Sequence, residues 1–223
     1  MNKAVEKALK ASIKKFAEIE KIDSQNFLNQ ILEVFNWEGN FLEKTDKFDA
    51  VFESNEGFEE LKEVYFDLMM INFFTADAAK LEADYLDSEE WADIEEQTLD
   101  RGTEFLNLLL YVNECKDEHI QPSLDDFLKE FLLVDEDEFQ DEFHIYEDLI
   151  SNQALAESSI EDICNNAGLM NLNEEMEELF VPFMCFFNQP NIDEKSIEEL
   201  EKFSNNASFD VALYTLIVNF NKI

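Results

Sequence analysis

The stretch FEELKEVYFDLMMINFFT, residues 58–75, decides the fold class of this chain. Between Val64 and Phe74 apolar side chains occupy so many positions that the apolar band covers most sides of a helix. A helix of this kind has to be surrounded by other elements, because only burial removes its surface from water. The stretch therefore predicts a central helix with further elements packed around it.

The rest of the chain predicts helices as those further elements. With Gly 4 and Pro 3 in 223 residues, the chain has few of the turn residues that hairpins and sheets require. Signals for the start and end of helices recur along the sequence, and no segment shows the alternation of a strand. We expect an all-α fold, a compact multi-helix domain of roughly ten to twelve amphipathic helices. Aromatic-rich helix ends recur at intervals close to those of helical repeats, which leaves stacked helical hairpins as an alternative to plain globular packing.

The sequence predicts the limits of several helices. Ser88 followed by Glu89 predicts the start of a long helix that runs to about Asn113. The others are a helix over residues 135–152, one over residues 173–187 with a kink at Pro182, one that starts with the capping box Ser196 and Glu199, and one that Ser208 starts.

The first 22 residues differ in charge from the rest. They hold six Lys and three Glu, a balance of +3. Val5, Leu9 and Ile13 fall on one side of a helix, whereas Lys7 and Lys14 fall on the opposite side. We therefore expect residues 1–22 to form a basic amphipathic helix that docks on an acidic all-α domain, residues 23–223.

The net charge is the main indication of function. The chain carries 53 Asp+Glu against 16 Lys+Arg, a formal net charge of −37, so residues 23–223 carry −40. A charge of this size destabilises a compact state through self-repulsion and exceeds what solubility requires. It opposes direct binding of nucleic acid, which needs Lys and Arg for phosphate contacts, and it opposes binding to anionic membranes. It favours a basic protein as the partner.

The charge is concentrated in residues 82–148, which hold 24 Asp+Glu and three basic residues. On one continuous helix after Ser88, five acidic side chains would share a face and form a partner-binding surface: Glu89, Asp93, Glu96, Asp100 and Glu104. They would span about 22 Å, one charge per about 5.6 Å, whereas duplex DNA has one charge per about 1.7 Å. A mimic of nucleic acid would need two or three such helices. An ordinary solvated face is the alternative interpretation.

The helix expected over residues 135–152 is the second candidate. Asp137, Asp141 and Asp148 lie on one face with His144, so we include the three Asp in the partner-binding surface. Asp141 and His144 could also bind a divalent metal. The chain has only two His, however, and the helical di-iron sites need two Glu-x-x-His motifs. We therefore expect no metal.

Catalytic signatures are missing from the sequence. It has no Gly-rich phosphate loop, no G-x-S-x-G and no H-E-x-x-H, so we expect no cofactor and no enzymatic activity. Cys115, Cys164 and Cys185 lie far apart without metal-ligand spacing, and Cys164 and Cys185, which sit among apolar residues, are expected to be buried thiols. The N-terminus lacks the apolar core of a secretory signal, and no apolar run is long enough to span a bilayer, so a cytoplasmic location is expected.

These observations suggest a non-enzymatic acidic protein that covers the basic surface of a partner, such as a nuclease, a toxin or a nucleic-acid-binding factor. Immunity proteins, antitoxins and the nucleic-acid mimics that inhibit restriction or CRISPR systems belong to this class. Two alternatives stay open. One is an acidic chaperone or scaffold for a basic client, and the other is a carboxylate-rich helical metalloenzyme around Asp141 and His144.

Overall fold

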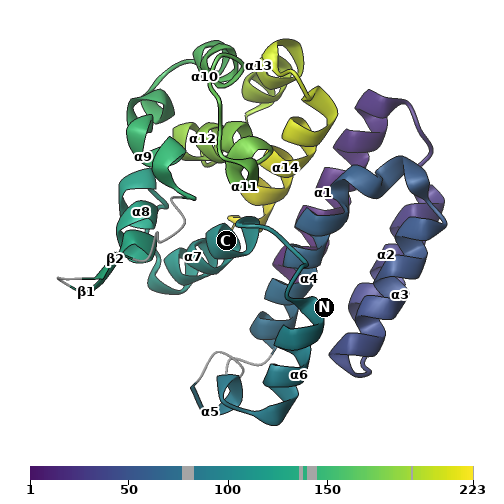
Figure 1. Cartoon of the computed structure of the whole chain (residues 1–223). Coiled ribbons are helices and arrows are strands. Elements are labelled where there is room, and N and C mark those ends of the chain that lie inside the picture. The colour runs from purple at the N-terminus through teal and green to yellow at the C-terminus, as the bar shows by residue number, and fades with distance from the viewer. Residues whose placement is uncertain (77–82, 136–137, 140–144, 192, 223) are drawn as a thin grey trace.

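The computed structural model describes residues 1–76, 83–135, 138–139, 145–191 and 193–222, and in this part the protein is almost entirely helical (Figure 1). The predicted all-α fold is confirmed. The described α-helices are α1 (Lys3–Glu20), α2 (Gln25–Asn36), α3 (Phe41–Glu53), α4 (Lys62–Ala76), α5 (Ala83–Leu86), α6 (Glu89–Thr98), α7 (Phe105–Glu118), α8 (Leu124–Leu132), α9 (Glu147–Ser151), α10 (Ile160–Ala167), α11 (Glu174–Glu177), α12 (Phe180–Asn188), α13 (Glu194–Phe203) and α14 (Ala207–Phe220). Two 3-10 helices, η1 (Glu56–Leu61) and η3 (Gln153–Glu157), and two short strands, β1 (Leu133–Asp135) and β2 (Glu138–Phe139), complete the described elements.

Two buried helices form the centre of the molecule. The predicted central helix is α4, whose residues from Val64 to Asn72 are all buried. The second is α14, which is buried from Ser208 to Phe220. Figure 1 shows the α2–α3 hairpin on one side of α1 and α4, and α7 with the later helices on the other.

The N-terminal helix packs along the last helix of the chain. α1 makes its most extensive contact with α14, and its predicted apolar face, which includes Val5, Leu9 and Ile13, is fully buried. In a solenoid each repeat contacts only its neighbours in sequence. The packing of the two ends of the chain against each other is therefore globular. The division into residues 1–22 and 23–223 stays a prediction.

Phenylalanine supplies much of the interior. Of the 22 Phe in the chain, sixteen are buried in the described part. The ring of Phe27 stacks on Phe58 with 4.0 Å between centroids and meets Phe52 edge-on at 5.2 Å. These contacts join α2, α3 and η1. The aromatic content thus stabilises a core despite the net charge.

The helix expected from Glu89 to about Asn113 is wrong. α6 ends at Thr98, and α7 begins only at Phe105. The helix expected over residues 135–152 is also wrong in its described part, because Leu133 pairs with Phe139 in an antiparallel β1–β2 hairpin and α9 begins at Glu147. Strands of two or three residues are too short to show a recognisable alternating pattern in the sequence.

Three helix starts also differ from expectation. α13 begins at Glu194, capped by the Asp193 carboxylate, which accepts a hydrogen bond from the Lys195 amide, so Ser196 is not its cap. α14 begins at Ala207, one residue before the expected cap. The helix expected over residues 173–187 divides into α11 and α12, and Pro182 lies in the first turn of α12, where proline is tolerated.

Two further properties of the described residues bear on the predictions. Cys164 and Cys185 are buried, as expected, and so is Cys115; none of the three forms a disulfide. No helix in the described ranges combines the length and the apolar character that crossing a membrane would require.

Candidate functional site

The sequence EEWADIEEQT of α6 forms a helix that buries only one side. Ser88 caps it, because the Ser88 hydroxyl oxygen accepts a hydrogen bond from the Trp91 amide at 3.2 Å. Ile94 and Thr98 are buried, and the Trp91 ring contacts Phe74 of α4 with 5.3 Å between centroids. The remaining sides of α6 face solvent and carry carboxylates.

We call these carboxylates and those of the flanking turns the α6 acidic surface. Its members are all exposed: Asp87, Glu89, Glu90, Asp93, Glu95, Glu96 and Asp100. The five members on α6 itself lie within about 15 Å, one charge per about 3 Å, which is within a factor of two of duplex DNA. The observed density therefore exceeds that of the single face expected from sequence, because both exposed sides of α6 are acidic.

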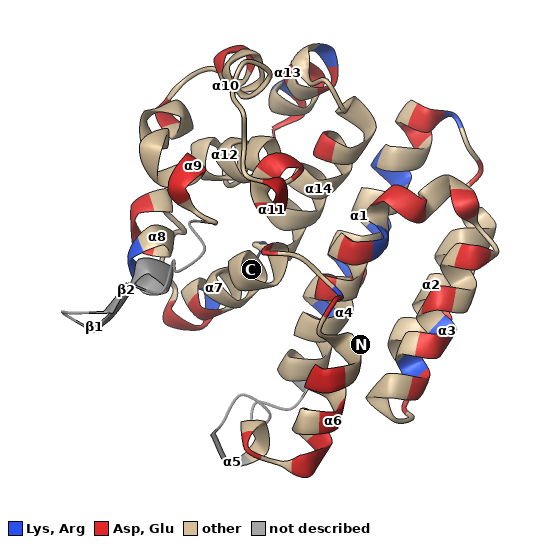
Figure 2. Cartoon of the chain, viewed as in Figure 1, with Lys and Arg blue, Asp and Glu red and all other residues tan. Residues whose placement is uncertain are grey.

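Basic side chains do not neutralise this surface. No ion pair in the described part of the chain involves its seven carboxylates. Figure 2 shows no Lys or Arg on α6, whereas Lys residues lie on several other helices. Several lysines form ion pairs with carboxylates outside the α6 acidic surface: Lys10 with Glu6, Lys14 and Lys15 with Glu18, Lys62 with Asp49 and Glu59, Lys129 with Asp125, and Lys195 with Glu199.

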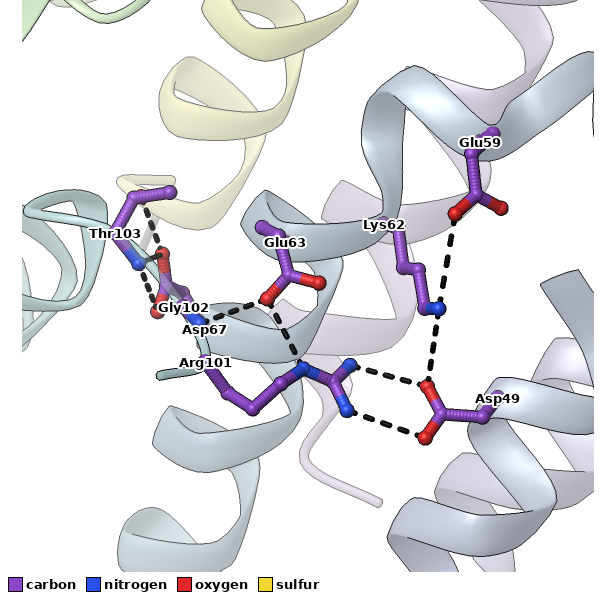
Figure 3. Close-up of polar contacts among 8 residues, drawn as sticks. All are labelled: Asp49, Glu59, Lys62, Glu63, Asp67, Arg101, Gly102 and Thr103. Atoms are coloured by element: carbon purple, nitrogen blue, oxygen red, sulfur yellow. Dashed lines mark hydrogen bonds and ion pairs between the residues drawn. The ribbon is translucent and has the colours of Figure 1, made fainter. Parts of the chain in front are cut away.

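Arg101, the only arginine in the sequence, holds the turn that follows α6 (Figure 3). Its Nη1 and Nη2 lie 3.2 and 3.1 Å from the two carboxylate oxygens of Asp49 on α3, and its Nε donates to Glu63 of α4 at 3.2 Å. The guanidinium also lies over the Phe66 ring, 4.5 Å from the centroid. One side chain thus joins α3, α4 and the α6–α7 turn.

Glu63 and a second acceptor on α4, Asp67, also bind the backbone of this turn. The Gly102 amide donates to Glu63 at 2.8 Å. The Thr103 hydroxyl and amide donate to the buried Asp67 carboxylate at 2.6 and 3.0 Å (Figure 3). Gly102 adopts a φ of +79°, in the left-handed region that favours glycine. The α4 carboxylates therefore capture backbone groups that a continuous helix would have used internally.

The same contacts explain the ionisation of Asp67 and Arg101. Burial raises the pKa of Asp67 well above its ordinary value, although the hydrogen bonds from Thr103 act in the opposite direction. Burial lowers the pKa of Arg101, but the charges of Glu63 and Asp49 outweigh burial, so the net change is upward. Arg101 is therefore a permanent cation surrounded by acids and serves structure.

We expect the substitution Gly102→Ala to destabilise the fold by about 1 to 3 kcal/mol. A Cβ atom at this position would lie 2.4 Å from Oδ1 of Asp67, and the φ of +79° adds strain. Gly57→Ala is the matched control, because its Cβ would meet only Ile22 Cδ1 at 3.5 Å and the φ of Gly57 is not positive. Urea unfolding of both variants tests this, and equal stabilities would contradict it.

The structure separates the eight predicted partner-binding residues. Glu89, Asp93 and Glu96 lie on α6, and Asp100 lies in the turn after it; all four are exposed. Glu104 does not share their helix: it precedes α7, where its carboxylate accepts hydrogen bonds from Asn107 at 2.8 Å and from the Tyr146 hydroxyl. The prediction that these five acids share one helical face is therefore wrong.

The second predicted cluster is also divided. Asp148 belongs to α9, and its carboxylate accepts a hydrogen bond from the Asn173 amide at 2.7 Å, which fixes the start of α11. Asp137 and Asp141, together with His144, lie outside the described residues. Within the described residues, no group of three or more His, Cys, Asp and Glu could hold a metal ion.

The signal that sequence analysis missed is Gly102. An isolated glycine in a helical pattern lowers the expectation of a continuous helix, and Arg101-Gly102-Thr103 interrupts the apolar periodicity there. The acceptors Glu63 and Asp67 lie more than 35 residues earlier, and nothing in the local sequence indicates them.

Comparison of this chain with family models, with curated proteins and with solved structures gives no match. Its function has to be inferred from its own residues.

Proposed function

We propose that the protein is a non-enzymatic acidic binding protein whose α6 acidic surface covers a basic surface of a partner protein. The observation that carries the proposal is that seven exposed carboxylates, between Asp87 and Asp100, have no basic neighbour in an ion pair within the described residues. Such a surface attracts Lys and Arg groups, and carboxylates that occupy these groups exclude phosphates from them. The protein would then act as a competitive inhibitor of a nuclease, a toxin or a nucleic-acid-binding factor.

The support of α6 by the rest of the fold favours this role. The helix is held by Ile94, Thr98 and Trp91, and the turn after it is fixed by Arg101. The helix backbone that carries the carboxylates is therefore fixed before binding, so little backbone entropy is lost on binding. The charge repulsion among them is relieved when a basic partner binds.

An exposed leucine favours a protein as the partner. Leu99, next to Asp100, is 78% exposed, and Leu86 at the other end of α6 is 39% exposed. Apolar side chains beside charges resemble the composition of protein interfaces, in which buried apolar contacts are surrounded by polar ones. An acidic scaffold for a basic client would use the same surface, and it is the second candidate function.

The test is a comparison of two variants with the same net charge. The first carries Glu89→Gln, Asp93→Asn, Glu96→Gln and Asp100→Asn, and the control carries Glu33→Gln, Glu161→Gln, Glu175→Gln and Glu198→Gln, which are exposed acids on other helices. Wild type and both variants are immobilised and exposed to a lysate of the source organism, with elution by a salt gradient. We expect basic proteins to elute from wild type and from the control. We expect the α6 variant to bind each of them at least about tenfold more weakly, since each charge pair contributes a few tenths of a kcal/mol or more.

Equal binding by both variants would show that only net charge matters and would contradict an α6 site. Retention that does not change with salt would contradict the electrostatic mechanism. A captured partner that binds nucleic acid gives a further readout, because the protein should displace labelled nucleic acid from it if it is an inhibitor, whereas a scaffold would leave that activity intact.

A further inference from the structure

A cavity of about 470 Å³ lies in the part of the molecule formed by α10, α11, α12 and the start of α14, away from α6 (Figure 1). Met170, Leu172, Val181 and Phe209 give it apolar walls. Its volume falls in the range of sites that bind small organic groups. Neither the proposed function nor any feature of the α6 acidic surface uses it.

The charged residues that line it are all acidic, and Ser204, Asn205 and Asn206 add neutral polar groups. Asp210 of α14 lines the cavity and is only 6% exposed to solvent. Glu177 and Glu178 line the cavity from the end of α11. No Lys or Arg is among the lining residues in the described part of the chain. The cavity therefore combines a carboxyl group in an apolar setting with the absence of a compensating cation.

The Asp210 carboxyl has a single described hydrogen-bond donor. The Ser204 hydroxyl donates to Oδ2 at 2.5 Å, and Ser204 in turn accepts from the Asn206 amide at 2.9 Å. A buried carboxylate ordinarily has a cationic partner or several donors, because removal from water disfavours its charge. Burial raises the pKa of Asp210 to about 7, and the charges of Glu60 and Glu178 act in the same direction. The neighbouring Cys164 and Cys185 thiols add no positive charge.

We propose that this cavity binds an organic cation, namely a guanidinium or alkylammonium group on a short apolar chain, with the Asp210 carboxylate as its ion-pair partner. The four apolar walls would contact the chain, and Glu178 would add a second negative charge. The arrangement matches the amphipathic character of an arginine or lysine side chain, which is an apolar stem with a charged end. Leu169, between two lining residues, is 87% exposed, as expected for a cavity that opens beside a contact surface for protein.

The experiment is titration of the full chain with butylguanidinium, followed by calorimetry and by the change in melting temperature at pH 8, where Asp210 is largely ionised. Butylurea, which has nearly the same shape without the charge, is the ligand control. The variant Asp210→Asn removes the charge and keeps the shape, and Glu161→Gln on the exposed part of α10 is the matched protein control. We expect wild type and Glu161→Gln to bind butylguanidinium at least tenfold more tightly than Asp210→Asn does. We expect no measurable binding of butylurea.

Equal affinity for the two ligands would overturn the proposal, and so would equal affinity of wild type and Asp210→Asn for butylguanidinium. Absence of binding at about 10 mM butylguanidinium would also overturn it. If Asp210→Asn does not fold, Val181→Phe, which fills part of the cavity, replaces it and should abolish binding. An additional arm uses a blocked Gly-Arg-Gly peptide. Binding of the peptide at least as tight as that of butylguanidinium assigns the cavity to a side chain of a protein partner, whereas binding of butylguanidinium alone assigns it to a free organic cation.

Discussion

Replacement of Arg101 by Ala is expected to lower the free energy of unfolding by about 2 to 3 kcal/mol, which corresponds to a decrease in melting temperature of about 5 to 10 °C. The side chain of Arg101 is 19% exposed, and its guanidinium compensates the charges of Asp49 and Glu63. Without it, Glu63 has no cationic partner near the buried Asp67, and Asp49 keeps only Lys62, in a chain whose net charge already opposes compactness. Chemical unfolding in urea measures the change.

The matched control is Lys10→Ala, which breaks an ion pair with Glu6 between two largely exposed side chains of α1. Exposed pairs on a helix stabilise by a few tenths of a kcal/mol, so this loss should be below about 0.5 kcal/mol. In the background Asp49→Asn with Glu63→Gln, the effect of Arg101→Ala should shrink by more than half, because the charges that Arg101 compensates are absent. Equal losses for Arg101→Ala and Lys10→Ala would show that the Arg101 contacts contribute no more than a surface pair.

Asp210→Asn is expected to raise the free energy of unfolding relative to wild type by more at pH 8 than at pH 5. The folded-state pKa of Asp210 is about 7, against an ordinary value of 3.8. Between these values the unfolded chain releases the proton and the folded protein keeps it, so wild-type stability falls as pH rises and the loss is complete above about pH 7. From pH 5 to pH 8 the difference amounts to about 2 to 3 kcal/mol, which the asparagine variant should not lose.

The measurement is urea unfolding of wild type and Asp210→Asn at pH 5, 6, 7 and 8, values above the sequence pI of about 4.1. Asp67 also has a raised pKa, but it is present in both proteins and cancels in the difference. Asp93→Asn at an exposed position reports the effect of removing one charge from the chain. If the stability difference between wild type and Asp210→Asn does not change with pH, the Asp210 carboxyl is not held in its neutral form by the fold.

Periodicity predicted the helices well where one side of the segment faces solvent. The apolar face of α1 follows from residues within the segment itself, since its consecutive turns carry the same pattern. Periodicity failed at residues 99–104, where it predicted a continuous helix. Acidic residues at helical spacing continue to Glu104, but Gly102 interrupts the apolar pattern, and Glu63 and Asp67 accept hydrogen bonds from Gly102 and Thr103.

The candidate site shows the same limit. Sequence identified the acidic region and four exposed members of the surface, Glu89, Asp93, Glu96 and Asp100, because charge and helical spacing are local properties. It could not show that Glu104 contacts Tyr146 or that Asp148 contacts the Asn173 amide, because these partners lie 42 and 25 residues away.

Composition by itself determined the fold class, the aromatic core and the acidic character of the surface, since these depend on how many residues of each type the chain has and on their local period. Tertiary structure alone decided which acids are solvated and which are buried. Asp67 and Asp210 have the same side chain as Asp93, but they lie on buried parts of α4 and α14, and there burial shifts the carboxyl group toward its neutral form. The state of each acid depends on the water that the surrounding helices exclude, and that is a property of packing between distant segments.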